Sequence, residues 1–197
     1  MPASDEDADN DWHQALLRLA EGHRTHAGYW AQEAVPSIAE LGVVQGLAEA
    51  LEEFGQSFFS NVRHRGQGED PPDCEAENRT GQRIAIEVTE LVDGVSAAKA
   101  RAGECYDWKD WGDELVPRLN SLIQRKDGAT TIKGGPYTEY VLVINTDEPG
   151  LEAAWARARL SNYVFPATSL ITRAFLLLSY CPFEQRCPCI ELRIDQP

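Results

Sequence analysis

Long hydrophobic runs, a secretion signal and an excess of basic residues are all missing from this sequence of 197 residues. No apolar run approaches the roughly 20 residues that a membrane-spanning helix needs, so we expect no membrane segment. Residues 1–7 are acidic and polar, and they lack the charged start and apolar stretch of a secretory signal peptide. Together these absences predict a cytoplasmic protein with no membrane partner.

Cysteine, serine, histidine and glycine do not form the patterns of familiar catalytic or cofactor sites. The five cysteines are an odd number in a chain without a secretion signal, which predicts reduced thiols. Cys181, Cys187 and Cys189 lie close together, but the paired Cys-x-x-Cys or His spacing of zinc sites is missing. The sequence also has no Ser/His/Asp arrangement, phosphate-binding glycine loop or dinucleotide fingerprint. Buried thiols are therefore the simpler interpretation of the cysteines.

Basic residues are scarce, since 18 Lys and Arg stand against 32 Asp and Glu and give a formal net charge of −14. Affinity for phosphates comes largely from Lys and Arg, so strong non-specific binding to nucleic acid is not expected. Basic residues nevertheless cluster at 63–65 and at Arg118, Arg125, Lys126 and Lys133. A local basic surface favours a nucleic-acid partner and the overall acidity favours a protein partner, so both stay open.

The pattern of apolar residues predicts one α/β domain. We expect residues 1–10 to be a disordered acidic tail and residues 11–197 to form a single domain. Helical spacing predicts helices over 11–33, 37–54 and 151–163, with a further helix that ends near Arg125. Runs of β-forming residues predict strands over 57–63, 74–78, 83–89, 139–145, 174–180 and 189–194. This order predicts a mixed central sheet flanked by helices.

The helix that ends near Arg125 carries an apolar stripe. Its members recur at helical spacing, and the next step of the stripe falls on a lysine: Trp108, Trp111, Leu115, Leu119, Leu122 and then Lys126. Pro117 does not suit the middle of one continuous helix, so we expect a kink there or a helix start close to Asp113. The two tryptophans are interpreted as core residues because they share the spacing of the stripe.

The most informative stretch of the sequence runs from residue 71 to residue 91. Pro71-Pro72-Asp73 opens a short strand, a tip containing Asn and Gly turns the chain, and a β-rich strand returns with Glu87 near its end. In the returning strand Glu87 and Thr89 share one face, and the opposite face is apolar. Taken singly, Asp73 is most simply interpreted as a turn residue and Glu87 as an exposed strand residue. Together they predict two carboxylates on neighbouring strands, which hard divalent cations prefer as ligands.

Asp73, followed on a hairpin by Ile-x-Ile-Glu, resembles the PD-(D/E)XK nuclease superfamily over roughly residues 37–145. Asp73 matches the motif aspartate and Glu87 the motif glutamate. The resemblance implies a restriction-endonuclease-like core in which Asp73, Glu87 and the carbonyl of Val88 hold Mg²⁺ or Mn²⁺. It also implies metal-dependent hydrolysis of phosphodiester bonds in DNA or RNA, because the ion lowers the pKa of a bound water and stabilises phosphoryl charge.

The motif lysine of this superfamily is replaced by Thr89. Threonine carries no positive charge, so the chain is inactive unless a lysine reaches the site from elsewhere. Members of the superfamily with a relocated lysine are known. Lys126, at the end of the apolar stripe, is our first candidate for that lysine, and Lys99 and Lys133 are further candidates.

The first helix of the superfamily often carries another acid that orients the metal. Glu49 or Glu53, one turn apart, are the predicted auxiliary acids, whereas Glu40 is assigned to a capping box with Ser37. Besides a nuclease, two other functions stay open. One is a catalytically inactive nuclease-fold protein that acts as a binding or assembly module in a larger complex. The other is an acidic protein that occupies a nucleic-acid site by mimicry.

Overall fold

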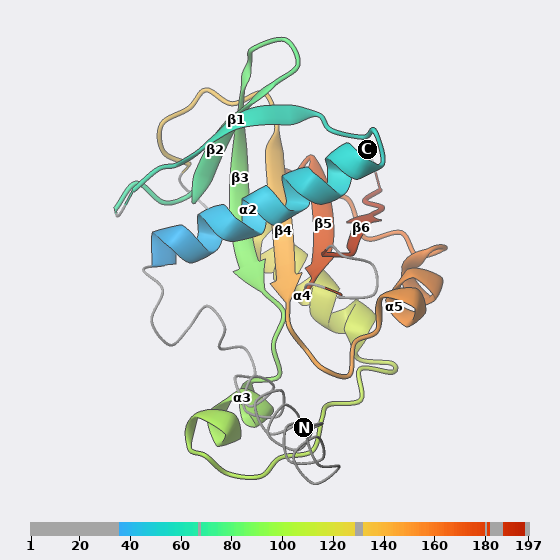
Figure 1. Cartoon of the computed structure of the whole chain (residues 1–197). Coiled ribbons are helices and arrows are strands. Elements are labelled where there is room, and N and C mark those ends of the chain that lie inside the picture. Colours follow the sequence, from blue (N-terminus) through green and yellow to red (C-terminus); the bar gives the residue numbers. More distant parts are fainter. Residues whose placement is uncertain (1–35, 67, 129–131, 180, 182–186, 196–197) are drawn as a thin grey trace, which may run out of the picture.

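A computed structural model describes residues 36–66, 68–128, 132–179, 181 and 187–195 of the chain. Its helices are α2 (Pro36–Glu53), α3 (Gly94–Arg101), α4 (Leu115–Asp127) and α5 (Ala153–Leu160). Its strands are β1 (Phe59–His64), β2 (Cys74–Asn78), β3 (Arg83–Glu90), β4 (Tyr140–Thr146), β5 (Arg173–Leu178) and β6 (Cys189–Leu192) (Figure 1). The predicted tail over 1–10 and helix over 11–33 lie outside the described residues.

The strands form one six-stranded sheet in the order β1-β2-β3-β4-β5-β6. The first three strands are antiparallel, β4 is parallel to both β3 and β5, and β6 is antiparallel to β5. Parallel neighbours need a crossover connection, and the two crossovers carry α3 with α4 and α5, respectively. The prediction of an α/β fold with a mixed sheet flanked by helices is therefore confirmed.

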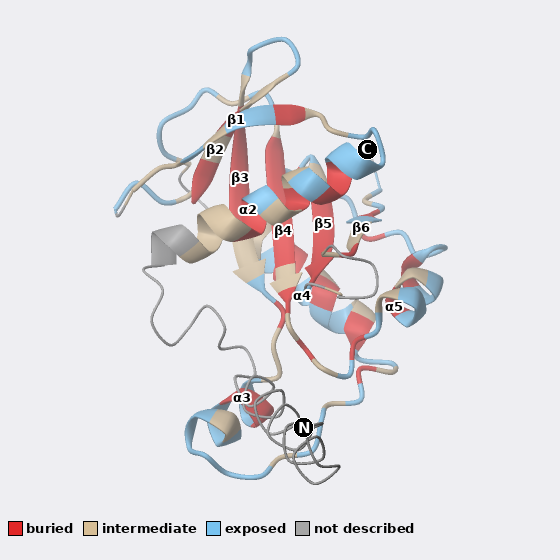
Figure 2. Ribbon diagram, in the orientation of Figure 1, coloured by how far each residue is buried: buried red, intermediate tan, exposed pale blue. Residues whose placement is uncertain are grey.

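Helices cover both faces of the sheet, with α2 in front of the strands and α4 behind them in Figure 1. The side chains buried between α2 and the sheet come from alternate residues of the strands, as the two-residue repeat of a strand requires. They include Val44, Leu47, Leu51, Cys74, Ala76, Ile84, Ile86, Val141, Val143, Phe175 and Leu177 (Figure 2). No helix in the described part of the chain is both long and apolar enough to cross a membrane.

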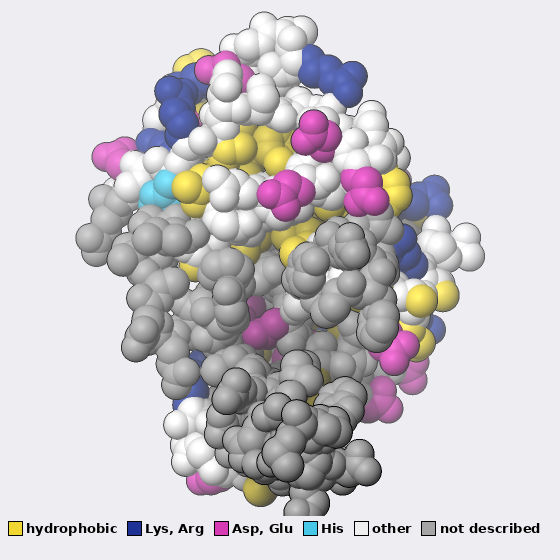
Figure 3. Space-filling view, in the orientation of Figure 1, with side chains coloured by type: hydrophobic (Ala, Val, Ile, Leu, Met, Phe, Trp, Pro, Cys, Tyr) yellow, Lys and Arg dark blue, Asp and Glu magenta, His cyan; other side chains and the backbone are white. Residues whose placement is uncertain are grey.

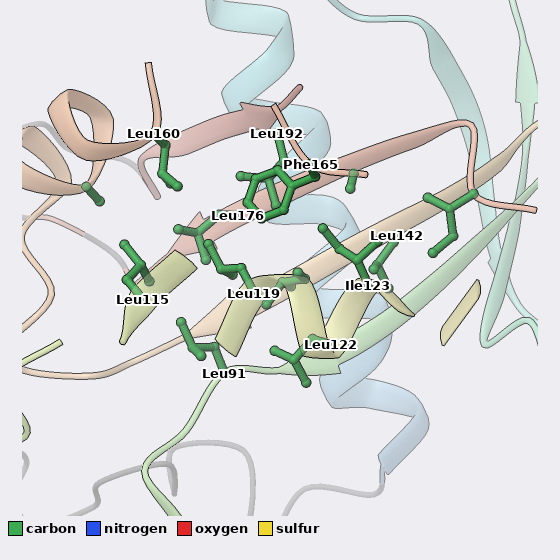
Figure 4. Close-up of a cluster of buried hydrophobic side chains, with 14 of the residues drawn as sticks. Leu91, Leu115, Leu119, Leu122, Ile123, Leu142, Leu160, Phe165, Leu176 and Leu192 are labelled. Carbon is green, nitrogen blue, oxygen red and sulfur yellow. The ribbon is translucent and has the colours of Figure 1, made fainter. Parts of the chain in front are cut away.

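The apolar stripe of α4 builds the core on the other face. Leu115, Leu119, Leu122 and Ile123 are buried, and Figure 4 shows Leu119 and Ile123 pointing toward Leu176 and Leu142 of the sheet. The helix begins at Leu115, close to the predicted start near Asp113. Pro117 lies in its first turn, where a missing N–H needs no partner within the helix.

The tryptophans that precede α4 differ in their environment. Trp111 is buried, as predicted, and its Nε1–H donates to Glu148 at 3.1 Å. Trp108 is 63% exposed, so its prediction as a core residue is wrong. The helical spacing that placed Trp108 in the core does not apply, because residues 104–114 are not helical.

Candidate functional site

The hairpin register places Asp73 opposite Glu87. Cys74 pairs with Ile86 in the antiparallel β2–β3 ladder, so the preceding residue, Asp73, faces the following one, Glu87. Cys74 and Ile86 pack under α2, and the alternation of side chains turns both acids to the face that α4 covers. Asp73 is 8% exposed and Glu87 is 5% exposed. The predicted meeting of the two carboxylates is present in the structure.

Each acid is held by hydrogen bonds from a neighbouring element. The N–H of Val88 donates to Asp73 Oδ2 at 2.7 Å. The hydroxyl of Tyr140, on the adjacent parallel strand, donates to Glu87 Oε2 at 3.2 Å. Burial and then the charge of Glu87 raise the pKa of Tyr140, so this hydroxyl keeps its proton and remains a donor. Both carboxylates are therefore oriented by donors on strands β3 and β4.

Burial beside a second carboxylate raises the pKa of Asp73. Loss of hydration makes the largest contribution and the charge of Glu87 adds to it, so the pKa moves from 3.8 to about 7. The Val88 N–H and the charge of Lys126 oppose this rise. Near neutral pH, the ionised form of Asp73 therefore lowers the stability of the folded protein. Such carboxylates are common where a cation or a proton is bound.

The carbonyl of Val88 points to the same side as Asp73. Parallel pairing of β3 with β4 uses the backbone groups of every second residue, as in the bonds from Ala85 N to Glu139 O and from Leu91 N to Asn145 O. Val88 is not one of the residues whose backbone bonds to β4, and its N–H donates to Asp73 instead. Its carbonyl is therefore directed toward the β2 side of β3.

Two carboxylates and one backbone carbonyl suit Mg²⁺ or Mn²⁺, hard cations that bind oxygen and, in the case of Mg²⁺, keep several waters. Each oxygen of Glu87 already accepts one hydrogen bond, and a carboxylate oxygen can accept a second partner. Among the described residues, no three His, Cys, Asp or Glu side chains form a group that holds a metal alone. The donor set thus fits an ion that completes its shell with water and substrate oxygens.

Lys126 reaches the acids from the last turn of α4. Its Nζ lies 2.5 Å from Glu87 Oε1, and the lysine side chain is 25% exposed. Of the other candidates, Lys133 donates to the carbonyl of Gly68 at 2.8 Å. Lys99 is an exposed residue of α3, which lies beyond the end of β3 (Figure 1). Lys126, the first candidate from the sequence, therefore contacts Glu87, and its charge also acts on Asp73.

The end of α4 is fixed by Asp127, the residue that follows this lysine. Its carboxylate accepts hydrogen bonds from the N–H groups of Ser169 at 2.8 Å, Leu170 at 2.7 Å and Ile171 at 3.0 Å. Burial opposes ionisation of Asp127, but these three N–H groups outweigh it and lower its pKa. The loop before β5 thus anchors the turn that carries Lys126.

Thr89, which stands at the position of the motif lysine, has a basic partner of its own. Its Oγ1 accepts a hydrogen bond of 3.3 Å from Nη2 of Arg125. Arg125 and Lys126 are neighbours in the last turn of α4, so one helix end brings two cations to the face of β3 that carries Glu87 and Thr89. The sequence places Arg125 in a basic cluster but does not indicate its partner.

The acid of α2 that acts on the site is Glu40. Its charge contributes to the raised pKa of Asp73, and its Oε2 lies 2.8 Å from Nε2 of His64. The N–H of Gly66 donates to Nδ1 of His64 at 2.8 Å, which leaves Nε2 as the protonated nitrogen and the donor to Glu40.

The predicted auxiliary acids lie further along the same helix. Glu49 is nine residues beyond Glu40, about 13 Å along the axis, and it is exposed. The charge of Glu49 acts on Cys187. Glu53 lies one turn further and is also exposed. The structure therefore replaces Glu49 and Glu53 with Glu40 as the acid of α2 that lies toward the site.

Arg63 and Arg83 lie on the face of the sheet that carries the acids, and Arg65 and Lys133 lie in loops that precede β2 and β4, respectively. We call the group of Arg63, Arg65, Arg83 and Lys133 the basic strip. Arg63 and Arg83 both pair with Glu75, which lies two residues after Asp73 on the same face of the sheet. Arg65 pairs with Glu69 and donates to the carbonyl of Lys133. The four positive charges of the basic strip outnumber the two negative charges of its partners, Glu75 and Glu69.

The opposite side of the molecule is acidic. Glu49, Glu52 and Glu53 are exposed along the second half of α2, and Figure 3, which looks onto α2, shows acidic side chains gathered there. The net charge of −14 is therefore distributed unevenly, with a local basic surface next to the candidate site. This arrangement agrees with the sequence expectation of a local basic surface on an acidic protein.

A cavity lies next to Tyr140. It measures about 310 Å³, and its walls include Ile132, Tyr137, Tyr140, Leu170 and Thr172. Tyr140 lines this cavity, and its hydroxyl donates a hydrogen bond to the carboxylate of Glu87. The site therefore has open space beside it.

Comparison of the chain with protein-family models, with curated proteins and with solved structures finds no match. What the chain does must therefore be inferred from its own residues.

Proposed function

We propose that this protein is a nuclease that uses Mg²⁺ or Mn²⁺ to hydrolyse phosphodiester bonds in DNA or RNA. The observation that carries the proposal is the convergence of Asp73 and Glu87 with Lys126, whose Nζ lies 2.5 Å from Glu87. Two acids and a lysine are what the resemblance to the PD-(D/E)XK superfamily requires. The element order, which is a helix, three antiparallel strands and two helices before a parallel strand, supports the same proposal.

Asp73, Glu87 and the carbonyl of Val88 are the groups that would hold the ion. When bound, the ion would lower the pKa of a bound water and neutralise charge on the phosphoryl oxygens. Tyr140 and the Val88 N–H fix the orientation of the two carboxylates. Lys126 supplies a positive charge at Glu87 from a helix instead of from the strand. Preorganised charge of this kind is often the largest contribution to catalysis.

The basic strip supports a nucleic-acid substrate. Phosphate groups are bound mainly through Lys and Arg, and Arg is suited to bidentate contact with phosphate oxygens. Arg63 and Arg83 lie on the face of the sheet that carries both acids. A phosphodiester chain that follows the strip would therefore pass the acids, while the acidic side of α2 would face away from it.

The test is a cleavage assay on single-stranded, duplex and nicked oligonucleotides, with Mg²⁺, with Mn²⁺ and with EDTA. The wild-type protein should cleave at least one of these substrates in a metal-dependent way, and Asp73→Asn should lose that activity. Glu77→Gln is the matched control, because Glu77 is a carboxylate of β2, four residues beyond Asp73, that accepts a hydrogen bond from Asn61. Equal cleavage by wild type and Asp73→Asn would refute the proposal.

The acidic surface of α2 favours a second candidate function, that of a non-catalytic module that binds a protein partner in a larger complex. This function does not need a metal at Asp73 and Glu87. Calorimetric titration with Mn²⁺ separates the two candidates, since a nuclease should show binding heat that Asp73→Asn removes. A module that has lost its catalytic role should give the same heats with wild type and variant.

A further inference from the structure

Arg125 is an exposed cation beside Thr89, two residues beyond Glu87 on β3. Its guanidinium makes one hydrogen bond of 3.3 Å to Thr89 Oγ1, and the residue is exposed. Lys126, by contrast, pairs with Glu87 at 2.5 Å, and its side chain is 25% exposed. A guanidinium carries five N–H donors in a planar fork, so the bond to Thr89 leaves several donors directed to solvent beside the site.

We infer that Arg125, held by Thr89, binds a phosphate group of the nucleic-acid strand next to the bond that is cleaved. This inference rests on the proposed nuclease function and adds a substrate-binding residue to it. Thr89 and Glu87 lie on the same face of β3, two residues apart, which in a strand is a separation of about 7 Å. A phosphate that contacts Arg125 would therefore lie next to the phosphate at the two acids.

Thr89 has a structural reason to occupy the lysine position under this inference. A lysine there would present a second cation to Arg125, whereas the threonine hydroxyl accepts a hydrogen bond from the guanidinium. The loss of the motif lysine and the presence of Arg125 are then two parts of one arrangement. Compared with the motif of the superfamily, the positive charge would then come from the end of α4 instead of from the strand.

The position of Arg125 is well defined because α4 is anchored on both sides of it. Leu122 and Ile123 are buried in the core before it, and Asp127 is bonded to the N–H groups of Ser169, Leu170 and Ile171 after it. Cations are also favoured in the last turn of a helix by the helix dipole. That structural role alone would not require Arg125 to contact substrate, so the two roles need an experiment to separate them.

The experiment measures binding of a short fluorescein-labelled single-stranded oligonucleotide by anisotropy, in Ca²⁺, at several salt concentrations. Each phosphate contact contributes about 0.7 to the slope of log K against log salt for a single strand. Arg125→Gln should weaken binding about tenfold and reduce the slope by about 0.7. Arg125→Lys should keep the slope but not the full affinity, because the charge remains while bidentate contact is lost. Thr89→Val should weaken binding by a smaller factor, because it removes only the acceptor that orients Arg125.

Arg118→Gln is the matched control, because Arg118 is an exposed arginine on the same helix, about 10 Å closer to its start. Its slope should equal that of the wild type. If Arg125→Gln and Arg118→Gln behave alike while the wild type binds with a clear salt dependence, the inference about Arg125 is overturned and the proposed function stands. If the wild type shows no salt-dependent binding at all, both are overturned.

Discussion

Replacing Asp73 with asparagine should stabilise the folded protein above neutral pH. Burial and the charge of Glu87 raise the pKa of Asp73 from 3.8 to about 7. A carboxyl whose pKa is raised by folding contributes stability that is fully present below pH 4 and is lost as the pH rises through 7. A tenfold change in proton affinity between the folded and unfolded chain corresponds to about 1.4 kcal/mol, so this one group lowers the free energy of unfolding by about 4 kcal/mol at pH 8.

Asparagine has nearly the same shape, carries no charge and can still accept the Val88 N–H bond. We therefore expect Asp73→Asn to match the wild type near pH 4 and to exceed its free energy of unfolding by about 2–4 kcal/mol at pH 8. Urea unfolding followed by tryptophan fluorescence, in EDTA, measures both proteins across this range. Glu152→Gln, which removes an exposed carboxylate at the start of α5, should track the wild type at every pH.

The same urea unfolding measurement can be repeated in the presence of divalent ions. A cation that binds the folded wild type raises its free energy of unfolding by an amount set by its concentration and affinity. Mn²⁺ should therefore restore part of the stability that the wild type loses above pH 7, and it should not stabilise Asp73→Asn in the same way. A variant that parallels the wild type from pH 4 to pH 8 would refute the assigned environment of Asp73.

Two further predictions concern the end of α4. Lys126→Ala should lower cleavage about 10²- to 10³-fold by removing charge that acts in the transition state, whereas Lys126→Arg, which keeps a positive charge at this position, should retain more of the activity. Equal loss in the two variants would contradict a role for the charge of Lys126. Asp127→Ala should lower the free energy of unfolding by about 2 kcal/mol, since three N–H groups lose a charged acceptor. Asp110→Ala, which loses only the exposed bond to Gly112 N, should cost clearly less, and equal losses in urea unfolding would show that Asp127 does not anchor the helix.

Local patterns explain which parts of the site could be predicted from the sequence. Asp73 and Glu87 lie on a hairpin, where the two-residue repeat and a short turn fix which residues face each other. Lys126 followed from the helical repeat of the stripe, which continues through Leu115, Leu119 and Leu122 into the last turn of α4. In both cases the relevant spacing lies within one element or between adjacent strands.

Contacts between elements that are distant in the sequence could not be predicted in this way. Glu40 lies toward the site and Glu49 does not because of the angle at which α2 crosses the sheet, which no periodicity encodes. The pairing of Arg125 with Thr89 likewise depends on where α4 docks, and their positions differ by 36 residues. Trp108 was misplaced for a local reason, since the helix that would have buried it begins only at Leu115.

Because Lys126 comes from a helix, the candidate site is complete only in the assembled tertiary structure. Glu87 and Lys126 are separated by 39 residues along the chain, and only the docking of α4 on the sheet brings them together. The hairpin brings the acids together through local contacts, whereas the counter-charge depends on a contact between residues distant in the sequence. Any event that loosens α4 while the strands stay paired would thus leave two facing carboxylates without their counter-charge, so the proposed activity would be lost before the fold.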